Sequence, residues 1–509
     1  MRHDSSSSKS RYHDLQLLLG LVLLATIGFH LFLALSDRAI GRDQHLGTAL
    51  LYAKNGIDLL NPVILGANAN GAPTPLEFPL WQALTGLLMK CFGTWHGWGN
   101  VVSLLFHVSS LWPVFHLARR LFSPRCAWWA LVLYSAQPLT FLYGGYASTD
   151  GMSAYLAVWF IYLVAEMLET KSWRWWAAAT VVGTLSATTK APFFFVMGLT
   201  AFFWLLQGHR NSGRAWLQLS TAGAISVIAF VAWNQHCNRC YAAGEMPVMD
   251  LRVGQGTEIM KWWLGDLAAR LSMRSWARGA WRASTILLGS IGLAVLPLAA
   301  FRLSDARPLR WWLLAGFVAL GVFTTLILIH WHYYYIFSVP VALLGARTVV
   351  EFEPVFCRVV SNAFLRTATC IAMVGAALAQ GLQAAHLNLF LDPHPVRSAK
   401  LLEQHTTSQD KLVVWGGAWS TPLLRAHRDG VITSTFSLIT DPAKLSRLKE
   451  LGYTRLVLVN NSPLLVAINA SSGSGDFKFK NLREELPTLA RNWSVAFESP
   501  EVLILDLPR

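Results

Sequence analysis

Long apolar segments recur along this sequence and limit the folds that it can adopt. Of its 509 residues, 54% are hydrophobic and 14% are charged, whereas soluble domains carry about 25% charged residues. A transmembrane helix needs about 20 mostly apolar residues, and about eleven segments have such a length. They are residues 15–35, 99–118, 126–143, 151–168, 174–189, 191–207, 215–234, 283–301, 311–329, 333–350 and 367–386. We therefore predict a polytopic α-helical membrane protein.

Basic residues between the apolar segments predict the orientation of the chain. If the polar tail of residues 1–14 is cytoplasmic, every loop on that side is basic, as the positive-inside rule requires. These loops contain Arg119, Arg120, Arg125, Lys171, Arg174, Arg210, Arg214, Arg302, Arg307, Arg310, Arg358 and Arg366. The net charge of +14 is therefore a topology signal and not a nucleic-acid-binding surface. Residues 15–35 then serve as a signal anchor.

The domain organisation follows from this topology. We predict a cytoplasmic tail over residues 1–14 and a transmembrane domain over residues 15–386, whose outer loops span residues 36–98 and 235–281. Charge rises after residue 387, and β-branched runs alternate there with helical patterns, which is typical of an α/β domain. We expect these strands at Lys411 to Trp415, Val431 to Phe436, Arg455 to Asn460 and Val502 to Asp506. Residues 387–509 are thus predicted to be a soluble α/β domain on the outer face.

Two features, one in the outer loop of residues 235–281 and one in a span, are expected to carry little chemistry. The pair Cys237 and Cys240 lacks the second cysteine pair of a zinc site, so we expect a local disulfide or idle thiols. His107 in the second span is expected to be packed or hydrogen-bonded. The middle of each span lacks Asp, Glu, Lys and Arg, whereas ion-coupled transporters carry ionisable residues near mid-membrane.

The first outer loop contains two candidate carboxylates. Asp43 opens a helical pattern that runs to Asn55 and stops at Gly56, so its carboxylate lies at a helix N-terminus and could simply cap that helix. Glu77 precedes an amphipathic stretch that ends at Gly93, and it could be a surface acid. Both side chains are candidates for handling a proton or a cation at the membrane surface.

Two further candidates lie in outer turns. Asp150 follows the third span in the stretch YASTD, where Thr149 or Asp150 could cap the next helix. Lys190 lies in a tight turn before Pro192, which we expect to hold it at the surface. Its point charge suits a phosphate, although contact with lipid headgroups is an equal alternative.

The loop of residues 235–281 combines arginines with tryptophans and leucines in a helical spacing that suits a helix lying in the membrane interface. Arginine binds phosphate through two parallel hydrogen bonds. We predict that some of Arg270, Arg274 and Arg278 bind a donor phosphate, and anchoring to lipid headgroups remains the alternative.

These residues occur in an order that resembles the GT-C membrane glycosyltransferases, over roughly residues 15–350 and the α/β tail. Protein O-mannosyltransferases and lipid A aminoarabinose transferases look closest. By this likeness Asp43 matches the catalytic carboxylate, Asp150 the second acid and Lys190 an active-site lysine. The cluster of His330, His332 and Tyr333 to Tyr335 resembles the late outer turn of the family.

The sequence departs from that pattern at two positions. Gln44 stands where many relatives have a second acid, and Glu77-Phe78-Pro79 stands where aminoarabinose transferases have Lys-Pro-Pro. The substrate of that branch is therefore not carried over. Asp43, His45 and Glu77 could gather a divalent metal, but their spacing fits no defined ligand set.

The resemblance implies an inverting glycosyltransferase of the cell envelope. It would move a hexose or pentose from a polyprenyl-phosphate donor, such as undecaprenyl phosphate, to a hydroxyl of a lipid, a glycan such as lipopolysaccharide, or a protein. Asp43 would be the general base, and cations would stabilise the leaving phosphate. The expected place is the bacterial inner membrane, with the active site on the periplasmic side. The rivals are a lipid-linked sugar flippase or transporter, and a catalytically silent assembly subunit.

Overall fold

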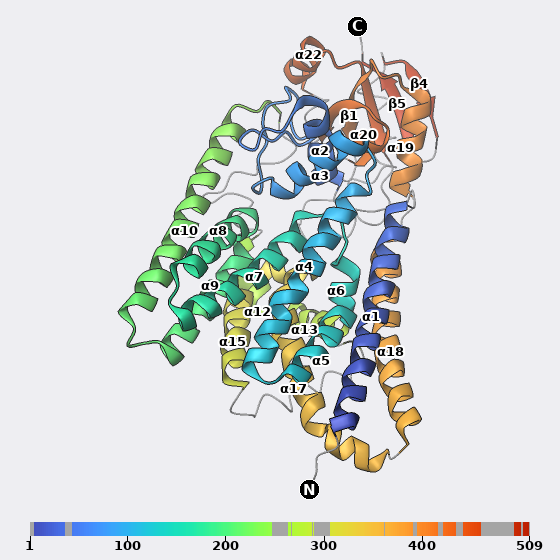
Figure 1. The fold of residues 1–509 in the computed structure, drawn as a ribbon. Helices are drawn as coiled ribbons and strands as arrows, with labels where there is room; N and C mark the ends of the chain where they lie inside the picture. Colours follow the sequence, from blue (N-terminus) through green and yellow to red (C-terminus); the bar gives the residue numbers. More distant parts are fainter. Residues whose placement is uncertain are drawn as a thin grey trace. The chain divides into compact units, whose positions relative to one another are not determined.

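The computed structural model divides the chain into two compact units, which are described separately. It describes residues 5–35, 43–246, 263–265, 267–287, 289, 306–360, 362–389, 394–415, 421–433, 441–459, 493–499 and 502–507. The first unit comprises Met1–Ala39, Gly97–Asn234 and Gly254–Leu389. The second comprises Ile40–His96, Gln235–Val253 and Phe390–Arg509. Figure 1 shows the helices and strands of both units.

The described part of the first unit is helical. Its elements are α1 (Ser5–Leu35), α4 (Trp98–Leu121), α5 (Pro124–Ala136), α6 (Pro138–Tyr143), α7 (Thr149–Thr170), α8 (Trp173–Thr189), α9 (Ala191–Gly208), α10 (Gly213–Ala242, whose last residues belong to the second unit), α12 (Leu267–Leu271), α13 (Met273–Leu287), α15 (Arg307–Val322), α16 (Thr324–Ile329), the 3-10 helix η2 (Trp331–Tyr334), α17 (Tyr335–Val359) and α18 (Ala363–Leu389). Helix α7 packs against α4, and α17 packs against α5.

The predicted spans agree with these helices except at three places. One is the predicted span 311–329, in which Phe323 separates α15 from α16. Residues 126–143 were expected to form one span, but the helix breaks at Gln137 because Pro138 starts the new helix α6 and Gln137 is extended. The side chain of Gln137 donates to the carbonyl of Ser338 at 3.0 Å and accepts from its hydroxyl. Most of the predicted span 283–301 lies outside the described residues.

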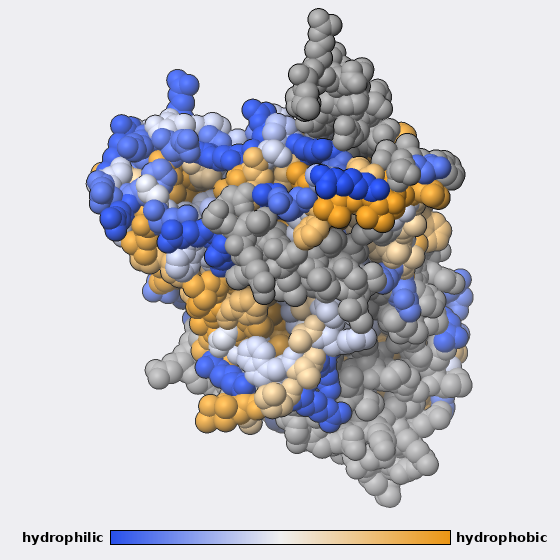
Figure 2. Space-filling model, turned by 90° about the horizontal axis from the view of Figure 1, so that it is seen from below, coloured by the Kyte–Doolittle hydropathy of each residue, from blue (hydrophilic) through white to orange (hydrophobic). Residues whose placement is uncertain are grey.

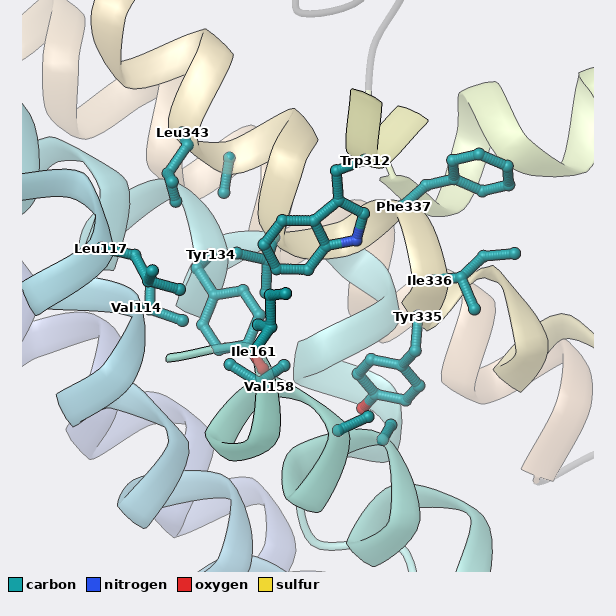
Figure 3. Close-up of a cluster of buried hydrophobic side chains, with 14 of the residues drawn as sticks. Val114, Leu117, Tyr134, Val158, Ile161, Trp312, Tyr335, Ile336, Phe337 and Leu343 are labelled. Carbon is teal, nitrogen blue, oxygen red and sulfur yellow. The ribbon is translucent and has the colours of Figure 1, made fainter. Parts of the chain in front are cut away.

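Helix α7 forms the centre of the first unit, because it packs against α4, α8 and α9 and most of its side chains are buried. Figure 3 shows the core beside it, where Val158 and Ile161 meet Tyr134 and Val114 and where Trp312 and Tyr335 also converge. His107 is fully buried, with its ring 6.0 Å from Tyr134 and 5.3 Å from Tyr155 between centroids. The prediction of a packed histidine is therefore confirmed.

Several helices suit a lipid bilayer. Five described helical stretches are long and apolar enough to cross a membrane, namely Trp98–Leu121, Thr149–Thr170, Ala191–Gly208, Gly213–Ala242 and Trp331–Val359. Hydrophobic and hydrophilic residues form separate patches on the face shown in Figure 2, as expected where apolar helix sides meet polar loops. The total of about eleven spans stays a prediction.

The second unit combines helices with a mixed sheet. Its helices are α2 (Asp43–Asn55), α3 (Leu80–Phe92), α19 (His394–His405), α20 (Thr421–Arg425) and α22 (Pro442–Glu450), and its strands are β1 (Lys411–Trp415), β2 (Asp429–Thr433), β3 (Arg455–Val459), β4 (Val495–Glu498) and β5 (Val502–Asp506). The strand order is β2-β1-β3-β5-β4. Strand β1 is parallel to β2 and β3, whereas β5 is antiparallel to β3 and β4. The sequence had predicted all of these strands except β4.

Part of the first outer loop belongs to this unit, and the separate α/β domain of residues 387–509 stays a prediction. The backbone N–H of Ile432 donates to the carbonyl of Gly66 at 2.9 Å, so the loop pairs with the edge strand β2. The hydroxyl of Tyr453 donates to the carbonyl of Ala69 at 2.9 Å. A sheet edge needs partners for its backbone groups, and here residues far away in the sequence supply them.

Candidate functional site

The predicted site residues fall into two clusters, one in each unit. The first cluster is built around Asp150 in the first turn of α7. The hydroxyl of Ser148 caps this helix by accepting from the backbone N–H of Asp150 at 3.1 Å. This corrects the expectation that Thr149 or Asp150 is the cap. Because Ser148 satisfies the helix end, the carboxylate of Asp150 is left to make other contacts.

Asp150 pairs with two basic side chains from distant elements. Its Oδ1 atom lies 3.3 Å from Nζ of Lys190 and 3.5 Å from Nε2 of His332. The Asp150 side chain is 2% exposed and that of Lys190 is 15% exposed. Lys190 is therefore not held at the surface, as the sequence had suggested, because the turn between α8 and α9 directs it toward Asp150. A buried ion pair persists only where its partners compensate for lost hydration.

Aromatic rings lie around His332, the histidine beside Asp150. The ring of His332 lies 4.5 Å from Tyr333, 5.2 Å from His330 and 6.1 Å from Tyr143, measured between centroids. These residues lie in or beside the short helix η2 and at the end of α6. The structure thus brings the predicted residues Asp150, Lys190, His330, His332 and Tyr333 together.

The second cluster is built around Asp43, the first residue of α2. Its side chain is 5% exposed, and its Oδ2 atom accepts from Nε of Arg425 at 3.3 Å. The Oδ1 atom is also buried, and no group in the described part of the chain donates a hydrogen bond to it. Asp43 forms a buried ion pair through Oδ2, whereas its buried Oδ1 atom has no donor among the described residues.

Two histidines complete the second cluster. The rings of His96 and His427 lie 6.3 Å apart between centroids. Burial lowers the pKa of His96, the charge of Arg425 lowers it further, and the carboxylate of Asp43 opposes both effects. His96 is therefore neutral near pH 7 and leaves Arg425 as the cation that pairs with Asp43.

The neighbouring candidate ligands are not gathered into one group among the described residues. The imidazole of His45 lies between two amides, with its Nδ1 atom 3.1 Å from Nε2 of Gln82 and its Nε2 atom 3.4 Å from Nε2 of Gln44. Glu77 is half-buried near the start of α3. No group of three or more metal-ligating side chains occurs among the described residues. Cys237 and Cys240 are free thiols, which agrees with the second of the two expectations, a local disulfide or idle thiols.

The predicted phosphate-binding arginines are exposed in the first unit. Arg270 donates to the carbonyl of Leu264 at 3.0 Å, and Arg274 and Arg278 are exposed on α13. The expected single helix is broken between α12 and α13 at Ser272. Arg282 is instead half-buried, donates to the carbonyl of Leu328 at 2.6 Å and lies 5.7 Å from the centre of the Trp331 ring. Phosphate binding and anchoring to lipid headgroups by the exposed arginines both stay predictions.

Sequence reasoning missed Arg425, His96, His427 and Arg282. Arg425 lies more than 380 positions after its partner Asp43, and no motif surrounds it. Arg282 continues the spacing of Arg270, Arg274 and Arg278 by four residues, which places all four on similar faces of a helix. That spacing could have included Arg282, whereas no local signal indicated the other three.

Comparison with known proteins agrees with this architecture. The family model of dolichyl-phosphate-mannose-protein mannosyltransferases matches residues 74–233. None of the curated proteins compared matches the chain. The crystal structure of ArnT from Cupriavidus metallidurans bound to undecaprenyl phosphate matches with a TM-score of 0.62 at 13% identity, covering 96% of this chain and 98% of that one.

Two other solved structures are similar. The oligosaccharyltransferase of Archaeoglobus fulgidus matches with a TM-score of 0.55 at 12% identity, over 87% of this chain and 68% of that one. The mycobacterial arabinofuranosyltransferase AftD matches with a TM-score of 0.54 at 15% identity, over 97% of this chain and 40% of that one. The resemblance to the GT-C superfamily is thus confirmed. The chain has the fold of these membrane glycosyltransferases, and its apolar helices make it an integral membrane protein.

Proposed function

We propose that this chain, built on the GT-C fold, is an inverting glycosyltransferase that takes a sugar from a polyprenyl phosphate. The acceptor is a hydroxyl of a lipid, a glycan or a protein at the periplasmic face of a bacterial inner membrane. The main support is Asp43, whose buried carboxylate uses one oxygen for Arg425 and has no donor to the other among the described residues. A general base needs such an available oxygen.

The chemistry is a single displacement. Oδ1 of Asp43 accepts the proton of the acceptor hydroxyl, and the hydroxyl oxygen forms a bond to the anomeric carbon of the sugar. The bond between that carbon and the phosphate oxygen breaks, so the phosphate leaves with the electron pair and the configuration inverts. A base that is held in place lowers the barrier both by proton transfer and by orientation.

Lys190 and Asp150 have a proposed role toward the donor. The ammonium group of Lys190 is a compact charge suited to a phosphate, and Asp150 keeps it in position at 3.3 Å. His332, 3.5 Å from the same carboxylate oxygen, adds a hydrogen-bonding group. That a structure with this fold, ArnT, was solved with bound undecaprenyl phosphate supports a polyprenyl-phosphate donor.

The test is the substitution Asp43→Asn in the full chain, reconstituted in lipid nanodiscs. The probes are undecaprenyl-phosphate-linked hexoses, pentoses and uronic acids, with envelope extract from cells lacking the protein as acceptor. Mass spectrometry should detect a sugar added by the wild type and a loss of at least about 100-fold in the variant, because general-base catalysis contributes about 10²- to 10⁴-fold.

The matched control is Asp58→Asn. Asp58 is an exposed acid of the same outer loop whose carboxylate accepts from Leu60 and Asn61, so transfer should continue. Unchanged transfer by Asp43→Asn would refute the assignment of the base. Translocation of the lipid-linked sugars without any change in acceptor mass would favour the flippase instead.

A further inference from the structure

The α/β region contributes an arginine to the second cluster. Arg425, the last residue of α20, points its Nε atom at Oδ2 of Asp43 over 3.3 Å. Both side chains are largely buried, at 13% and 5% exposure. A guanidinium group has a planar, rigid set of donors and keeps its charge at any physiological pH, so it can fix the orientation of a carboxylate.

The packing around α20 determines where Arg425 lies. Leu423 and Leu424 are buried in the unit, and α20 contacts both α2 and α19. Leu423 also lies against Gly66, where a Cβ atom would come within 2.8 Å of Cδ1 of Leu423. The chain after α20 turns at His427, whose φ of 52° is unusual for a residue other than glycine. These contacts hold Arg425 in a fixed position relative to α2, the helix that carries Asp43.

The other charges near the pair do not replace Arg425. His96 faces Asp43, Arg425 and His427, and burial lowers its pKa. A neutral imidazole gives little electrostatic support to a carboxylate. Arg428, three residues beyond Arg425, donates instead to the carbonyls of Glu403, Thr406, Ala426 and His427 and to the hydroxyl of Thr406. The hydrogen bonds of Arg428 therefore stabilise the turn itself.

We propose that Arg425 is the positioning residue for Asp43, so that the α/β region completes the catalytic apparatus. Arg425 holds Oδ2 and thereby presents Oδ1 to the acceptor hydroxyl. This inference rests on the proposed function. It assigns the region of residues 390–509 a direct part in the reaction, through one side chain that does not touch the substrate.

The test compares Arg425→Gln, Arg425→Lys and Arg425→Ala in the nanodisc assay. Loss of orientation should lower kcat by about 10- to 100-fold with little change in KM for the donor, because the proposal gives Arg425 a contact with Asp43 and none with the donor. Arg425→Lys should recover part of kcat, and added methylguanidinium should raise kcat of Arg425→Ala. Adding Arg425→Gln to the Asp43→Asn variant should cause no further loss of kcat.

Arg428→Gln is the matched control, since it removes an equal charge from the same turn but no contact with Asp43. An equal fall in kcat for Arg428→Gln would show that loosening of the turn is the cause and would overturn the proposal. So would an unchanged kcat in Arg425→Gln, or a raised kcat, which would mark Arg425 as an inhibitor of the base. Failure of the proposed function is recognised separately, because the wild type itself would then transfer no sugar or Asp43→Asn would remain active.

Discussion

At the scale of single residues, Asp150 and Lys190 form a buried ion pair in the first unit. Both side chains are largely buried and their charged atoms lie 3.3 Å apart. Removing one partner of a buried pair leaves an uncompensated charge, which costs about 3–5 kcal/mol. Lys190→Met should therefore lower the free energy of unfolding by about that amount, as measured by thermal or denaturant unfolding in detergent.

The control for this prediction is Lys171→Met, which removes an exposed lysine of the same unit and should have little effect. The double variant Asp150→Asn with Lys190→Met should be less destabilised than the sum of the two single variants, because it leaves no buried charge unpaired. Additive losses would contradict the importance of the ion pair.

At the scale of secondary-structure elements, the edge strand β2 holds the first outer loop in place. Gly66 has a φ of +80°, and an added Cβ atom would come within 2.8 Å of Leu423 and 3.1 Å of Ile432. Gly66→Ala should therefore combine backbone strain, about 1–2 kcal/mol for the left-handed region, with a steric clash. We expect a clear fall in unfolding free energy of the second unit, measured by hydrogen exchange of β2.

Gly71→Ala separates the two causes. Gly71 also has a positive φ, of +68°, but an added Cβ atom would meet nothing within 4 Å. This variant should show only the backbone strain and a smaller loss than Gly66→Ala. Equal losses in both variants would mean that the contact with β2 contributes nothing.

At the scale of the whole molecule, the second unit is assembled from three separate stretches of the chain. Residues 40–96 and 390–509 fall into one compact unit, in which Gly66 pairs with β2 and Tyr453 bonds to Ala69. Removing residues 390–509 should therefore both abolish sugar transfer and leave residues 40–96 without their sheet. Limited trypsin digestion should then cleave at Lys54 or Lys90 much faster than in the full chain.

If trypsin cleaved residues 40–96 of the truncated chain no faster than in the full chain, this prediction would be contradicted. The division at residue 387 that the sequence predicts would then be favoured. The full chain, digested under the same conditions in nanodiscs, is the reference. Cleavage is followed by mass spectrometry of the released peptides, so that cuts in residues 40–96 are distinguished from cuts in the first unit.

The sequence by itself determined the elements of this protein, because they depend on local signals. Apolar length gave the helices of the first unit, the stop at Gly56 gave the end of α2, and β-branched runs gave four strands. Pro138 is a local signal for a helix break, although the apolar length of residues 126–143 predicted one span there. Strand β4 was missed because Val495–Glu498 is short and mostly exposed, so its sequence lacks the alternation of apolar and polar residues that a half-buried strand shows.

Only the tertiary structure decided which residues meet. Asp150, Lys190 and His332 come from separate helices and turns, and Asp43 meets Arg425 across most of the sequence. Such pairings depend on packing between distant elements, which leaves no periodic trace in the local sequence. The sequence therefore specified Asp43, Asp150, Lys190 and His332 as candidates. The packing of side chains decided that Lys190 and His332 meet Asp150 and that Arg425 meets Asp43.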